Sequence, residues 1–150
     1  MDDSKLKISP PLYLAGMKIN CWKCGKRMPV VALVAPNVED ADGEVCVLCD
    51  ITELPKNVLE YVQGRVPTFK LKFSKTVNDK YYANTCPSCG VITGDFYIHN
   101  EPGAPFFPES EDDAKSLYIT EIPITKNIYV ESGCHMGTGD MIVEYARKIA

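Results

Sequence analysis

Six of the seven cysteines fall into Cys-x-x-Cys pairs, and this spacing constrains the fold more than any other feature of the 150-residue chain. The three pairs are Cys21/Cys24, Cys46/Cys49 and Cys86/Cys89. Two such pairs supply the four thiolates of a tetrahedral zinc site. In a reducing compartment, cysteines at this spacing bind metal or carry out redox chemistry rather than form structural disulfides. The question is therefore which two of the three pairs bind the metal.

A glycine follows the second cysteine in the first and the third pair, as Gly25 and Gly90. Glycine adopts the positive φ that a tight turn around a metal requires. This feature predicts a zinc site formed by Cys21, Cys24, Cys86 and Cys89. Two alternatives remain open. In the first, the metal is bound by the first and second pairs, whose separation along the chain is the more usual one for a zinc site. In the second, one pair is a redox Cys-x-x-Cys, which needs an activated cysteine at a helix N-terminus, although neither the first nor the third pair precedes a helical pattern.

The middle pair lacks the glycine and lies in the Val-rich, strand-like segment 44–51. Residues three apart on a strand point to opposite faces, so Cys46 and Cys49 are expected to be small buried hydrophobic residues. A second, Cys3His metal site is the alternative. Its four ligands would be Cys46, Cys49, Cys134 and His135.

Apolar periodicity predicts an α+β chain that is mostly β, with zinc-ribbon-like antiparallel strands and two short helices. The predicted strands are 30–34, 44–51, 68–74, 81–82, 96–98, 117–119 and 128–130. The predicted helices are 54–62, ended by Gly64, and 140–149. Residues 1–11 are expected to form an extended lead-in, 100–116 a loop, and 132–140 a glycine-rich loop. No linker divides the chain, so residues 1–150 are expected to form one zinc-ribbon-containing domain.

Several strings in residues 21–108 together resemble a group of small, uncharacterised bacterial zinc-ribbon proteins. They are Cys21-Trp22-Lys23-Cys24-Gly25-Lys26 with Pro29-Val30-Val31-Ala32-Leu33, Tyr81-Tyr82-Ala83-Asn84-Thr85-Cys86-Pro87-Ser88-Cys89-Gly90, Gly94-Asp95-Phe96, Glu101-Pro102-Gly103 and Pro105-Phe106-Phe107-Pro108. The resemblance implies a zinc ribbon and a cytoplasmic bacterial setting. It implies no enzymatic activity, and the pattern does not include Cys46 and Cys49.

Composition and charge narrow the function classes. The chain has no apolar run long enough to span a membrane and no apolar segment near its start that is typical of a secretory signal, so a cytoplasmic location is expected. Its net charge of −4 comes from two acidic blocks, residues 36–60 and 87–113, separated by basic ones. These blocks favour a basic protein partner over a nucleic acid.

The expected function is that of a non-catalytic protein with a structural zinc ion that serves as a protein-interaction module. Rigid aromatic anchors beside a charged rim are common in protein interfaces. The predicted partner-binding residues are Phe106, Phe107, Glu111, Asp112 and Asp113. One role of this kind is that of an immunity or antitoxin protein that inhibits a basic partner.

Two other function classes remain. A nucleic-acid-binding ribbon would use Trp22, which lies between two predicted ligands, together with the cations Lys23, Lys26 and Arg27. An enzyme would use Cys134 as a nucleophile. His135 is a poor base for it, because adjacent side chains on a strand point apart.

Overall fold

The computed structural model describes residues 5–75 and 78–149, which form ten strands and four helices. The strands are β1 (Lys5–Ile8), β2 (Leu12–Asn20), β3 (Arg27–Ala35), β4 (Cys46–Glu53), β5 (Phe69–Ser74), β6 (Asp79–Thr85), β7 (Ile92–Thr93), β8 (Tyr118–Ile122), β9 (Ile128–His135) and β10 (Arg147–Lys148). The helices are α1 (Lys56–Arg65), α2 (Asp95–His99), α3 (Glu111–Lys115) and α4 (Gly139–Tyr145). The predicted α+β class, mostly β, is confirmed.

Seven strands form one sheet in the order β1-β9-β4-β3-β2-β8-β10, and β5-β6-β7 form a second, smaller sheet. All neighbouring pairs are antiparallel except the short β8–β10 pair. Strand β1 pairs with β9 at one edge of the large sheet, with Leu6 opposite Val130. Part of the predicted lead-in 1–11 is therefore a sheet strand, which matches its alternating Lys-Leu-Lys-Ile sequence.

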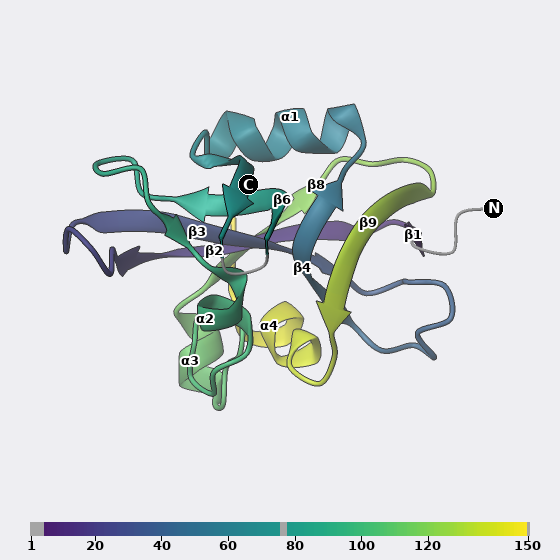
Figure 1. Ribbon diagram of the computed structural model, residues 1–150. Coiled ribbons are helices and arrows are strands. Elements are labelled where there is room, and N and C mark those ends of the chain that lie inside the picture. The colour runs from purple at the N-terminus through teal and green to yellow at the C-terminus, as the bar shows by residue number, and fades with distance from the viewer. Residues whose placement is uncertain (1–4, 76–77, 150) are drawn as a thin grey trace.

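Helices cover both faces of the large sheet (Figure 1). Helix α1 lies on one face, where Val58 and Val62 join a buried cluster with alternate residues of the strands. Helices α2 and α4 contribute Ile98 and Ile142 to a second buried cluster on the other face. None of the helices in the described part of the chain is long and apolar enough to cross a membrane, α1 being the longest at ten residues.

Several local predictions were wrong. Helix 140–149 is shorter than predicted, since α4 ends at Tyr145 and is followed by strand β10. Residues 96–98 belong to helix α2 rather than to a strand, because three apolar residues cannot distinguish the two periodicities. The acidic run forms helix α3, whose N-cap Ser110 accepts a hydrogen bond from the N–H of Asp113. Strand β9 extends to His135 into the predicted glycine-rich loop, and helix α1 continues through Gly64.

Candidate metal centre

Two β-hairpins each present one Cys-x-x-Cys turn. The first turn joins β2 to β3, and the second joins β6 to β7. Their backbones match: Gly25 N–H donates to the Cys21 carbonyl at 3.0 Å, and Gly90 N–H donates to the Cys86 carbonyl at 2.9 Å. Both glycines have positive φ, 76° and 79°, while a Cβ at either position would meet no atom within 4 Å. Backbone conformation, not lack of space, therefore requires glycine at these two positions.

The two turns bring four sulfur atoms together. Cys21 Sγ lies 3.6 Å from Cys89 Sγ, and Cys24 Sγ lies 3.7 Å from Cys86 Sγ. All four ligand atoms lie within 4.8 Å of one another. A tetrahedron with Zn–S bonds of about 2.3 Å has sulfur–sulfur edges of about 3.8 Å. The cluster therefore has the donors and the size for one tetrahedral metal ion, and the predicted choice of pairs is the one that converges.

Backbone N–H groups direct positive charge at the sulfur atoms. Hydrogen bonds from backbone N–H groups, that of Cys89 foremost, lower the pKa of Cys86 to about 6. The Cys24 N–H likewise lowers the pKa of Cys21. At Cys89 the Val91 N–H acts in the same direction, yet burial and the neighbouring thiols raise the pKa to about 11. Four thiolates packed this closely repel one another, and a bound cation removes that penalty because metal ligation deprotonates thiols.

The small sheet is attached to the large sheet by contacts close to the cluster. The Asn84 side chain accepts a hydrogen bond from Val31 N–H at 2.9 Å and donates one to the Val31 carbonyl at 3.1 Å. Trp22 Nε1 donates to the Ile92 carbonyl of β7 at 2.9 Å. The cluster and these contacts therefore join hairpins from two different sheets.

The four residues of the alternative second metal site do not converge in the described part of the chain. Cys134 packs with Cys46 in the buried cluster under α1, whereas His135, the next residue, contacts His99 on the opposite face. Cys49 lies across from Gly133 and also points away from Cys46. Among residues 5–75 and 78–149, Cys21, Cys24, Cys86 and Cys89 are the only group of three or more His, Cys, Asp or Glu residues whose ligand atoms converge. Cys134 and His135 also cannot act as a nucleophile–base pair, because the strand separates them.

The predicted partner-binding residues divide between core and surface. Phe106 is fully buried, and its N–H donates to the Ile98 carbonyl at 2.9 Å, so it is a core residue and not a surface anchor. Phe107 is half-buried and stacks on the His135 ring at 6.4 Å between centroids. The acidic side chains Glu111, Asp112 and Asp113 are exposed on α3. Phe106 is buried because it packs in one cluster with Ile98 of α2 and with residues of the large sheet.

A buried polar cluster behind α2 was missed from the sequence. His99 Nδ1 lies 3.0 Å from His135 Nε2, and His99 Nε2 lies 4.0 Å from the carboxylate of Asp95. Asp95 also accepts a hydrogen bond from Asp50 N–H at 2.7 Å. Burial raises the pKa of Asp95 to about 7 and lowers the pKa of His99 to about 3, so the neutral forms of both are favoured. The i,i+4 spacing of Asp95 and His99 would have indicated that the two side chains meet on one helix face, but residues 96–98 were predicted to form a strand.

The most exposed aromatic side chains lie near the first turn and on α2. Trp22 is 68% exposed, and Phe96 and Tyr97 are 62% and 63% exposed. Phe96 and Tyr97 contact each other edge to face, with ring centroids 6.0 Å apart. The Trp22 ring faces solvent apart from its hydrogen bond to β7.

Comparison with family models, with curated proteins and with solved structures finds no match to this chain, so the resemblance to bacterial zinc-ribbon proteins stays a prediction.

Proposed function

We propose that this chain is a non-catalytic zinc protein in which one Zn²⁺, bound by Cys21, Cys24, Cys86 and Cys89, fixes a surface that binds another protein. The observation that carries the proposal is the convergence of four sulfur atoms from two hairpins at tetrahedral spacing. Thiolate donors in this number are typical of structural zinc.

The donor set supports a structural role over a catalytic one. A catalytic zinc ion keeps one coordination position open for water or substrate, and four cysteines leave none. The two hairpins belong to different sheets, so the ion acts as a cross-link between them. Free energy of metal binding is then free energy of folding.

The partner surface that we propose is the acidic surface of Glu109, Glu111 and Asp112 at the start of α3. All three side chains are exposed. A basic protein complements this charge, which raises the association rate more than the final affinity. Inhibition of a basic partner, as an immunity protein performs it, is one role that such a surface serves.

Charge reversal tests the partner surface. Asp113 is left unchanged because its carboxylate accepts a hydrogen bond from Glu109 N–H at 3.0 Å and holds the loop. The variant Glu111→Lys is compared with Glu60→Lys on α1, on the opposite face of the sheet. The two are matched, because each glutamate forms an i,i+4 ion pair with a lysine. Partners are recovered from cells with each tagged chain and quantified by mass spectrometry, and their association rates are measured at two salt concentrations.

The proposal expects a basic protein that the Glu60→Lys chain retains and the α3 variant loses or binds more slowly. If every partner binds both variants at the same rate and with the same salt dependence, the acidic surface is not the interface. Zinc content is measured in both variants, since a surface change must leave it at the wild-type value.

A nucleic-acid-binding role is the second candidate, and the exposure of Trp22 favours it. An exposed aromatic ring flanked by the exposed cations Lys23, Lys26 and Arg27 is suited to stacking on a base next to the phosphate backbone. This role predicts binding of single-stranded DNA or RNA that weakens with salt and with Trp22→Ala. Absence of binding to either nucleic acid at low salt excludes it.

A further inference from the structure

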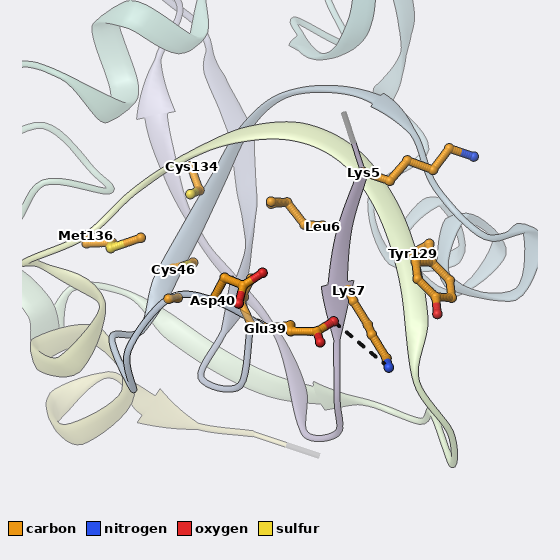
Figure 2. Close-up of a pocket in the computed structure, with 11 residues that line it drawn as sticks. Lys5, Leu6, Lys7, Glu39, Asp40, Cys46, Tyr129, Cys134 and Met136 are labelled. Carbon is orange, nitrogen blue, oxygen red and sulfur yellow. Dashed lines mark ion pairs between the residues drawn. The ribbon is translucent and has the colours of Figure 1, made fainter. Parts of the chain in front are cut away.

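A pocket of about 680 Å³ opens beside β1, β4 and β9, far in sequence from both zinc-binding turns. Figure 2 shows Cys46, Cys134 and Met136 on one side of it and Lys5, Lys7 and Tyr129 on the other. Of the three sulfur-bearing residues, Cys46 is fully buried, Cys134 is half-buried and Met136 is 47% exposed. The sulfur side of the pocket thus runs from the core to the surface.

Strand register explains why the sulfur residues meet. In the β4–β9 pair, Leu48 is opposite Cys134 and Val47 is opposite His135. Cys46 is two residues from Leu48 and shares its face, so Cys46 and Cys134 are diagonal neighbours on that face. Met136 directly follows β9, and extending the register by one residue places it across from Cys46. Strand β4 and the end of β9 therefore supply two thiols and one thioether.

We propose that Cys46, Cys134 and Met136 form a binding site for a soft monovalent metal ion, Cu(I), in this pocket. Thiolate and thioether ligands select Cu(I) over harder divalent ions. The pocket carboxylates of Glu39 and Asp40 do not converge with the two cysteines, since no second group of carboxylate, thiol or imidazole donors occurs in the described residues. The third donor that we propose is the Met136 sulfur, because Met136 lines the same pocket as the two cysteines.

A bridging ion also fits the diagonal arrangement better than a disulfide does. A disulfide requires sulfur atoms about 2 Å apart and Cβ atoms about 4 Å apart. Diagonal residues of an antiparallel pair are separated by roughly 7–8 Å, less between their Cβ atoms. A metal ion between the two thiolates spans the larger distance without moving the strands.

The charge balance of the site is simple. Cu⁺ displaces one proton from each of the two thiols, and the thioether remains neutral, so the occupied site carries one negative charge and releases two protons without any change in oxidation state. Burial, followed by the proximity of Cys134, raises the pKa of Cys46 to about 12. Binding is therefore expected to weaken as pH falls. Lys7, which lines the same pocket, forms an ion pair with Glu39 at 3.9 Å, and Lys5 forms one with Glu53.

The test uses the zinc-loaded full chain without oxygen and Cu(I) supplied as its complex with a chromogenic chelator. We expect wild-type protein to remove one equivalent of Cu(I) from the chelator without releasing zinc. Cys46→Ala/Cys134→Ala loses this equivalent and keeps its zinc. Cys49→Ala, which removes a thiol on the other face of β4, is the matched control and keeps both. Met136→Leu weakens binding by at least the ~10-fold that loss of a supporting contact around a metal site costs.

A second readout needs no substitution. The chain contains five methionines, and ¹³C-labelled methionine methyl groups report on each of them by NMR. We expect the Met136 methyl signal to shift with the first equivalent of Cu(I) while the other four stay in place. Copper uptake matched by zinc release, full uptake in the double cysteine variant, or an unchanged Met136 signal at saturation overturns the proposal.

Discussion

Asn84 replaces a missing strand neighbour at the edge of β3, and Asn84→Ala tests how the two sheets are attached. On one side β3 pairs with β2, where Val31 is opposite Gly16. On the other side β4 reaches only Val34 and Ala35. The Asn84 amide therefore satisfies both backbone groups of Val31 on that open side, at 2.9 and 3.1 Å, and is itself buried.

The magnitude follows from the two hydrogen bonds. Alanine leaves a buried N–H and a buried carbonyl without partners, and each costs about 1–3 kcal/mol. We therefore expect Asn84→Ala to lower the free energy of unfolding by about 2–6 kcal/mol. At roughly 2–4 °C per kcal/mol for a chain of this size, Tm falls by at least about 4 °C.

Urea unfolding of the zinc-loaded protein, followed by circular dichroism, measures the effect. Asn57→Ala is the control because Asn57 is exposed on α1, where alanine is the better helix former. It is expected to leave stability unchanged or slightly higher. If Asn84→Ala unfolds within about 1 kcal/mol of wild type, below the cost of even one lost buried pair, the amide does not attach the sheets as described.

Three further predictions concern the metal, the core and pH. Cys86→Ser/Cys89→Ser removes a metal cross-link between Cys24 and Cys86, which are 62 residues apart, and loss of this loop closure alone is expected to lower the free energy of unfolding by about 4 kcal/mol. Urea unfolding with zinc analysis measures the effect, and metal loss with unchanged stability contradicts a structural role. Phe106→Ala costs about 3–5 kcal/mol because Phe106 is fully buried, and Phe107→Ala costs less; equal effects in thermal unfolding contradict this ranking. Burial raises the pKa of Asp95 from 3.8 to about 7, so Asp95 contributes stability at low pH that is lost as pH rises toward 7. The Asp95→Asn variant lacks this loss, so its free energy of unfolding is expected to rise relative to wild type between pH 4 and 7. A difference in free energy that stays constant over this range refutes the buried neutral carboxyl.

Local chemistry predicted the metal cluster, because the requirement for glycine after the second cysteine is a property of the turn itself. The alternation of side chains along a strand predicted that Cys46 and Cys49 point to opposite faces. Loop spacing pointed to the wrong partner pair, since it takes no account of which hairpins the sheets bring together. The long segment between Cys24 and Cys86 returns to the first turn through the packing of β6 against β3 and β4.

The errors come from a missed helix signal and from contacts between segments that are distant in the sequence. The acidic run was assigned to a loop although Ser110 stands three residues before Asp113, a spacing typical of a helix N-terminus. Phe106 was placed on the surface because its neighbouring prolines indicate a loop, yet that loop folds back onto α2. The pairing of His99 with His135 depends on a contact between segments 36 residues apart, and periodicity within either segment carries no information about it.

X-ray absorption at the zinc edge, combined with metal analysis of the native protein, tests the structural zinc centre most directly. The account predicts one zinc ion per chain, surrounded by four sulfur atoms at about 2.3 Å. Absence of zinc, or nitrogen and oxygen atoms in the first coordination shell in place of sulfur, would contradict it.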